Sequence, residues 1–223
     1  MFKIVPLIVL NGYDYEKSTR QRDYSDNYDS YWKNCLADSG IYGLTRYQGP
    51  VGHRTKRDEH NYVNMVQLLH NYPALYALLL HRLADRRQSD FLLEELLEDN
   101  ALFRGGYAIE YGSSSAIYPR CCHTLQYFHD WKRVAASPKS SRERLGIWMG
   151  HPEIVITPIG ASEFEISDTI DDFCPEVEFE PFRVNRDEVV SAVESCESVL
   201  RCLKQQVPPI LKILRRSWNR RIL

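Results

Sequence analysis

The sequence has no long uninterrupted apolar run. Its longest early run, residues 1–10, contains Lys3 and Pro6 and ends at Asn11-Gly12. It is therefore shorter than the about 20 residues that cross a bilayer. It also lacks the charged region and small-residue cleavage site of a secretory signal. We expect no transmembrane segment and a cytoplasmic location.

The sequence also lacks a large excess of charge of either sign. Its 28 Lys and Arg residues are nearly balanced by 30 Asp and Glu residues, which leaves a formal net charge of −2. Such a charge creates no long-range attraction for polyanions. Any affinity for nucleic acid or for a membrane surface must therefore come from a local patch.

Two families of catalytic and cofactor motifs are missing. Residues 104–106 and 112–115 contain glycine and serine but match neither GxGxxG nor GxxxxGK, and no GxSxG elbow is present. We therefore expect no nucleotide cofactor and no α/β-hydrolase site.

Cysteine is present, but without the spacing of a zinc site. Zinc ligands usually occur as separated pairs, because two adjacent cysteines cannot easily direct both sulfurs at one ion. A Cys–His catalytic pair or a metal site would have to be assembled by the fold from Cys121, Cys122, His123, His129 and His151. We favour packing or surface roles and no metal, with reduced thiols at Cys35, Cys121, Cys122, Cys174, Cys196 and Cys202.

The apolar fraction and the pattern of short strands and helices indicate an α+β fold. An apolar fraction of 43% in 223 residues is enough for a substantial core. We expect one domain over residues 1–223, with a helical subdomain at 61–104 as an alternative. A mixed or antiparallel sheet is expected from short strands at 2–10, 107–111, 147–149, 154–159 and 163–166. Pro6 favours an edge position or a bulge for the first strand, because proline cannot donate to a strand ladder.

Several amphipathic helices accompany these strands. The apolar spacing predicts helices at 25–38, 62–70, 74–87, 91–103 and 185–207. Segments rich in glycine, proline and serine predict loops at 41–60 and 134–144. Pro208-Pro209 is expected to end the helix that starts at Asn185, before a separate basic helix at 210–223.

The helix at 185–207 is the best defined. Asn185 and Glu188 have the spacing of a capping box. One apolar stripe follows at Val189, Val193, Cys196, Leu200, Leu203 and Val207. The stripe covers fewer than three heptads, so we expect it to dock on the chain's own sheet rather than to form an intermolecular coiled coil.

Carboxylates crowd residues 163–180, where no lysine or arginine occurs. We predict an acidic docking surface for a basic protein there, formed by Glu163, Glu165, Asp168, Asp171, Asp172, Glu176 and Glu178. A solvated acidic strand and loop is the simpler interpretation, and a divalent metal site is the third.

The C-terminal region has the opposite sign, since no acidic residue follows Ser198. The candidate contact residues are Arg215, Arg216, Trp218 and Arg220. On a helical wheel of residues 210–223 the apolar and basic side chains separate onto two faces. Such a helix could pack on the core, bind an acidic protein or nucleic acid, or lie on a membrane surface.

These observations favour a non-enzymatic protein-binding module, such as an immunity protein that neutralises a toxin or an adaptor in a larger complex. The acidic and basic segments and a tyrosine-rich N-terminal third motivate this hypothesis. The alternatives are a small hydrolase or nuclease with a Cys/His or carboxylate site, and a nucleic-acid-binding protein that uses residues 210–223.

Overall fold

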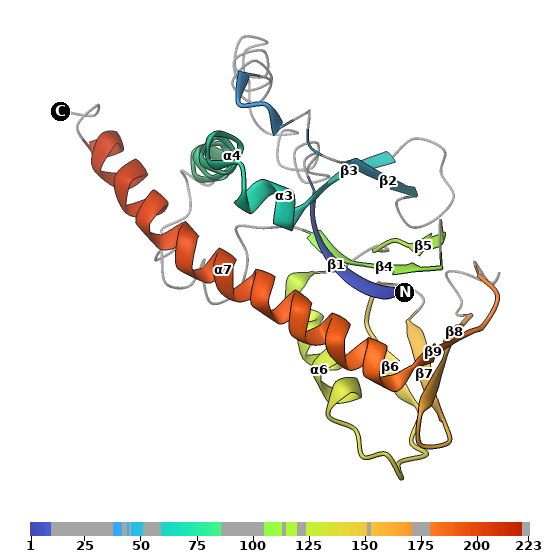
Figure 1. The fold of residues 1–223 in the computed structure, drawn as a ribbon. Coiled ribbons are helices and arrows are strands. Elements are labelled where there is room, and N and C mark those ends of the chain that lie inside the picture. The colour runs from blue at the N-terminus through green and yellow to red at the C-terminus, as the bar shows by residue number, and fades with distance from the viewer. Residues whose placement is uncertain are drawn as a thin grey trace.

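The computed structural model describes residues 1–9, 38–41, 44, 46–50, 59–85, 105–112, 115–119, 124–150, 153–170 and 179–219. In this part of the chain two antiparallel sheets combine with the helices α3, α4, α6 and α7 (Figure 1). The predicted α+β class is therefore confirmed. The predicted helices at 25–38, except for Asp38, and at 91–103 lie outside the described residues.

The first sheet has the strand order β2-β3-β1-β4-β5. The strands are β1 (Phe2–Val9), β2 (Arg46–Pro50), β3 (Glu59–Asn64), β4 (Gly105–Tyr111) and β5 (Ser115–Ile117). β1 lies in the middle and is apolar on both faces: Phe2, Ile4 and Ile8 join the main core, while Val5 and Leu7 join a smaller cluster on the other face. Burial on both faces explains its nearly continuous apolar sequence.

The predicted edge position of β1 is wrong, since β3 and β4 flank it. Pro6 is tolerated because the pairing of β1 with β3 begins only at Leu7, so Pro6 pairs with β4 alone. On the β4 side the approach is very close. A Cβ atom on Gly105 would overlap the carbonyl oxygen of Leu7, so only glycine fits there.

The second sheet has the order β6-β7-β8-β9. Its strands are β6 (Leu145–Ile147), β7 (Ile154–Ile159), β8 (Glu163–Asp168) and β9 (Phe182–Asn185). Gly160, with φ +66°, allows the tight connection between β7 and β8. Tyr111 of β4 stacks on Phe182 of β9 with ring centroids 3.8 Å apart, which joins the two sheets.

Two predicted segments around residue 60 need correction. The expected loop at 41–60 contains β2 and the start of β3, because an edge strand such as β2 accommodates Gly49-Pro50 at its end. The helix expected at 62–70 is shorter, since α3 spans Met65–Leu69 and is capped by Asn64, whose side-chain oxygen accepts from the Val66 N–H. The predicted second helix corresponds to α4 (Tyr72–Asp85), with Pro73 in its first turn as expected.

A helix not predicted from the sequence precedes β6. The short 3-10 helix η2 (Leu125–Tyr127) leads into α6 (Phe128–Ala135), which buries Phe128, Trp131 and Val134. The predicted loop at 134–144 therefore begins inside α6, and residues 136–144 connect α6 to β6 without a helix or strand.

The longest element, α7 (Arg186–Asn219), corrects the expected break at Pro208-Pro209, because one helix continues through both prolines. Its buried stripe also continues, from Leu203 and Val207 to Ile210, Leu211 and Leu214. The two missing N–H groups would have bonded the carbonyls of residues 204 and 205, which lie on the exposed face where water can reach them. Packing of the stripe thus outweighs the intrinsic preference of proline to end a helix.

One buried apolar cluster takes residues from both sheets and from α3, α4, α6 and α7. The stripe of α7 packs within it, as predicted, with Cys196 1% exposed and Val207 1% exposed. Burial raises the pKa of the Cys196 thiol, with a smaller contribution from nearby Glu197. Among the helices of the described residues, none is sufficiently long and apolar to cross a membrane.

Candidate interaction surface

The outer face of α7 carries acidic side chains near its start and basic side chains farther along. Asp187, Glu188 and Glu194 are exposed, and Glu197 is half-buried, along the first third of the helix. Arg201, Lys204 and Lys212 are exposed farther on. We call this face the outer ridge, the first group its acidic half and the second its basic half. The acidic half ends before Ser198 and the basic half begins after it.

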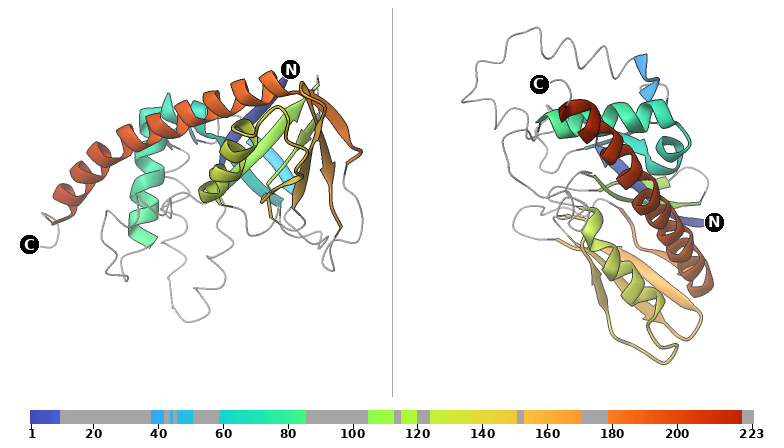
Figure 2. Two further views of the ribbon diagram at one scale, coloured as in Figure 1. Left: turned by 90° about the horizontal axis from the view of Figure 1, so that it is seen from below. Right: turned by 90° about the vertical axis from the view of Figure 1, so that its left-hand side faces the viewer.

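The outer ridge follows α7 along the outside of the molecule. In the left view of Figure 2, α7 lies along the upper margin of the fold, with most of the other described elements below it. The exposed residues between Glu194 and Arg201 are Ser195 and Ser198, so no bulky exposed side chain separates the two halves. The middle of the ridge therefore has only small exposed side chains, with charged side chains on either side of it.

The helix dipole explains only part of this arrangement. Acidic side chains in a first helical turn are favourable, because the partial positive charge of the N-terminus attracts them. That reason applies to Asp187 and Glu188. It does not extend to Glu194, more than one turn inside the helix, or to Arg201 and Lys204 in its middle. These side chains are not required by the dipole.

Two residues of the acidic half have ion-pair partners among the described residues: Oε1 of Glu188 lies 3.7 Å from the N-terminal amine of Met1, and Glu197 pairs with Lys132. Nζ of Lys132 in α6 donates to Oε1 of Glu197 over 2.8 Å. The hydrogen bond and the charge of Lys132, with a smaller effect of Arg201, lower the pKa of Glu197. Among the described residues, Glu194, Lys204 and Lys212 have no ion-pair partner.

The predicted acidic surface at 163–180 is only partly described. Glu163 and Glu165 lie on the face of β8 opposite buried Phe164 and Ile166, and all of them follow the alternation of an antiparallel strand. Asp168 ends the strand. Its Oδ1 accepts from the Thr169 N–H over 2.9 Å. The remaining predicted residues, Asp171, Asp172, Glu176 and Glu178, lie outside the described residues.

A basic residue that is not in the acidic stretch lies beside it. Nε of Arg183 in β9 is 3.9 Å from Oε2 of Glu165, its cross-strand neighbour. The described part of the acidic stretch is therefore partly neutralised.

Among the described residues, the acidic strand β8 lies near the start of α7, far from the basic residue Lys212. β9 joins directly to the start of α7, where the Arg186 N–H donates to the Ser162 carbonyl over 2.8 Å. Lys212 lies 26 residues farther along the helix, which corresponds to about 40 Å. Arg215, Arg216 and Trp218 continue α7, whereas their side chains and Arg220 lie outside the described part of the chain.

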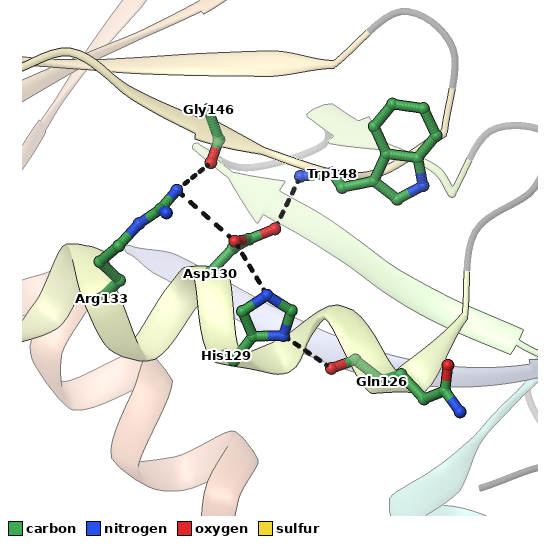
Figure 3. A network of polar contacts seen from close by, with 6 residues as sticks. All are labelled: Gln126, His129, Asp130, Arg133, Gly146 and Trp148. Atoms are coloured by element: carbon green, nitrogen blue, oxygen red, sulfur yellow. Dashed lines mark hydrogen bonds and ion pairs between the residues drawn. The ribbon is translucent and has the colours of Figure 1, made fainter. Parts of the chain in front are cut away.

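His129 is the residue of the proposed Cys/His constellation that lies within the described residues, and it belongs to a polar cluster at α6, shown in Figure 3. Nδ1 of His129 lies 3.1 Å from the Gln126 carbonyl oxygen, and Nε2 lies 3.4 Å from Oδ1 of Asp130. Oδ2 of Asp130 accepts from the Trp148 N–H over 3.2 Å. Arg133 donates to the Gly146 carbonyl over 3.1 Å. The contacts of Asp130 and Arg133 connect α6 to β6 and to the residue that follows it.

The proposed Cys/His constellation is not tested as a whole. Cys121, Cys122, His123 and His151 lie outside the described residues, so their position relative to His129 is not defined. Within the described ranges no three His, Cys, Asp or Glu side chains are grouped so that they could hold a metal ion.

Arg186, the first residue of α7, is charged but buried. Arg186 is 3% exposed, and its Nη1 donates to the Ser137 carbonyl oxygen over 2.8 Å and to Ser137 Oγ over 3.0 Å. Its guanidinium carbon lies 4.2 Å from the centre of the Phe164 ring. Nε and Nη2 have no hydrogen-bond partner among the described residues. Arg186 therefore anchors the start of α7 to β8 and to the connection after α6.

Comparison with known proteins gives no relative: no protein-family model, no curated protein and no solved structure matches the chain. Sequence reasoning found the basic residues after Ser198 but missed the acidic half. The available signal was the helical position of Asp187 and Glu194, which share a face with Arg201 and Lys212 at about 100° per residue.

Proposed function

We propose that this protein is a protein-binding module, acting as an adaptor or as a neutralising partner, and that it docks through the outer ridge of α7. The observation that carries the proposal is the reversal of charge along one exposed helix face whose opposite face is committed to the core. Because the buried stripe holds α7 in place, the exposed charges are not needed for packing. They are available for contact with another molecule.

The order of the charges favours a protein over a nucleic acid. A polyanion that followed α7 would meet Arg201, Lys204 and Lys212, but then Glu194 and Asp187. Glu197 lies about 6 Å from Arg201 along the helix, within the about 8–10 Å over which salt leaves charge interactions largely unscreened, so a polyanion on the basic half is also repelled by Glu197. A partner surface with the opposite order of charges gains from both halves, which supports a protein partner of bipolar charge.

Nucleic acid remains the second candidate function, because the basic half carries three exposed cations of one sign and further arginines follow it in the sequence. It predicts binding that weakens steeply with salt. Fluorescence anisotropy with labelled duplex DNA and with RNA measures this directly. Binding that is lost when residues 210–223 are deleted, and that is insensitive to Glu194→Lys, would favour nucleic acid over protein.

The protein-binding proposal is tested by site-specific photo-crosslinking. A photoreactive amino acid at Ser198, in the middle of the ridge, should form a crosslink of one defined mass with a protein in cells that naturally contain the chain. A matched probe at Lys139, which is exposed in the connection between α6 and β6, serves as the control. The crosslinked protein is then identified by mass spectrometry.

Charge reversal decides whether the ridge makes the contact. Lys204→Glu together with Lys212→Glu should remove most of the crosslink from Ser198, whereas Lys139→Glu should not change it. A crosslink that is equally strong from Lys139, or that survives the double reversal, would show that the ridge is not the docking surface.

A further inference from the structure

The outer ridge of α7 is complementary to itself. Position 199 lies midway between Glu194 and Lys204 and also midway between Glu197 and Arg201. Asp187 and Lys212 are almost as symmetric about it. If a second α7 is laid along the first in the opposite direction, Asp187, Glu194 and Glu197 of one helix therefore lie beside Lys212, Lys204 and Arg201 of the other, whereas Glu188 lies beside Ile210.

We infer that a second copy of this chain occupies the outer ridge, in a two-fold symmetric pair with antiparallel α7 helices. A two-fold contact uses the same patch on both copies, so it requires a patch that is complementary to itself. A parallel pair would place acidic half against acidic half and is disfavoured. The inference rests on the proposed function, since it names one partner for the same surface.

The shape of the ridge permits this approach. Ser195 and Ser198 lie at its centre, and small side chains let two helices come close. In the left view of Figure 2 most of the described elements other than α7 lie on its inner side. Exposed apolar surface on the ridge is small, Ile213 being 51% exposed, so the pair is held mainly by charge.

A contact of this kind is weak and depends on salt. Exposed ion pairs contribute about 0.2–1 kcal/mol each, and the symmetry makes every pair occur twice. A partner that presents its charges to the ridge in the same order as the second copy, and that binds more tightly, would then replace that copy. Pairing of two copies would cover the ridge until such a partner replaced one of them.

The experiment is sedimentation velocity of the purified full chain, over a range of concentrations, at about 0.05 M and about 0.5 M salt. We expect the wild type to form a dimer at the lower salt concentration and to dissociate at the higher one. A chain that stays monomeric at every concentration in low salt overturns the inference.

Charge exchange tests the arrangement of the two helices. Glu194→Lys and Lys204→Glu should each weaken dimerisation by about tenfold or more, because each creates two like-charge contacts. An equimolar mixture of the two variants should recover dimerisation, since the reversed residue of one copy then faces an opposite charge on the other. Unchanged dimerisation of either variant, or no recovery in the mixture, contradicts the antiparallel pair.

Two controls make the result specific. Glu143→Lys and Lys139→Glu make the same changes of charge at exposed positions in the connection between α6 and β6, outside the ridge, and should leave dimerisation unaltered. An equal loss in these controls would mean that net charge, not the ridge, controls association. A monomeric wild type that still crosslinks to another protein from Ser198 would refute the pair and leave the proposed function standing.

Discussion

The two faces of α7 have different organisation along the same 34 residues. The inner face is uniform: Val189, Cys196, Val207 and Leu214 are all buried in one apolar cluster. The outer ridge changes from acidic to basic around Ser198. A uniform inner face is what a helix needs to pack on a core. The change of sign on the outer face is not required for folding, and it distinguishes the part of α7 that stabilises the fold from the part that we assign to binding.

The largest expected change in the free energy of unfolding comes from a substitution on the inner face. Leu203 is 4% exposed, and Leu203→Ala should lower the free energy of unfolding by about 2–5 kcal/mol, because it removes buried contacts and leaves a cavity. Gln205→Ala, on the exposed face two residues away, should change it by less than about 0.5 kcal/mol. Urea denaturation followed by circular dichroism measures both. Similar effects of the two substitutions would contradict the division into faces.

The second-largest loss of stability should come from replacing Arg186, the buried arginine at the start of α7. Arg186→Ala removes two hydrogen bonds to Ser137 and the contact with the Phe164 ring, and we expect a loss of about 1–3 kcal/mol. The gain from removing two unpaired donors offsets part of the loss. Arg183→Ala, which removes only an exposed ion pair with Glu165, should cost no more than about 1 kcal/mol. Denaturation of both variants tests this, and an equal loss would show that burial of Arg186 is not what matters.

Replacing Pro208, which lies at the border of the two faces, should have a smaller effect of opposite sign and raise the free energy of unfolding. Pro208→Ala restores a helical N–H group inside α7, and we expect stabilisation by about 1–2 kcal/mol after the greater entropy of the unfolded chain is included. Pro138→Ala, in the connection after α6, provides the control and should not stabilise. The thermal midpoint distinguishes the two variants. A destabilised Pro208→Ala would mean that the proline ring itself packs in the core.

The smallest expected effect is at the inner end of the acidic half. The lowered pKa of Glu197 means that its contact with Lys132 stabilises the fold fully above the ordinary pKa of 4.5. This contribution is lost as the pH falls through the lowered pKa. Lys132→Met should therefore raise the pKa of Glu197 toward 4.5, as measured by an NMR titration of its side-chain carboxyl group. Lys139→Met should not, and an unshifted pKa in Lys132→Met would exclude the contact.

Strong local patterns allowed the sequence to predict much of the fold. Alternation in residues 163–166 and the stripe from Val189 to Val207 correspond to elements whose buried faces are those expected. The errors occur where tertiary contacts outweigh local preference. Pro208-Pro209 does not end α7, because the buried residues Ile210 and Leu211 continue its packing. Pro6 lies in a central strand, because β3 pairs only with the residues that follow it.

The candidate surface was harder to predict than the fold. The basic residues after Ser198 were evident from composition alone. Arg201 and Lys204 lay in the same predicted helix as Glu194 and Asp187, but the expected break at Pro208 separated Lys212 from them. Only the continuous helix places Lys212 on the same ridge.

The most direct test of the account measures the crosslink from Ser198 in a variant whose three exposed bases, Arg201, Lys204 and Lys212, are all replaced by glutamate. Its free energy of unfolding should stay within about 1 kcal/mol of the wild type, because these side chains are exposed. The account predicts that the crosslink to a protein partner disappears while the fold persists. A crosslink of undiminished yield in this folded variant would contradict the assignment of the ridge to binding.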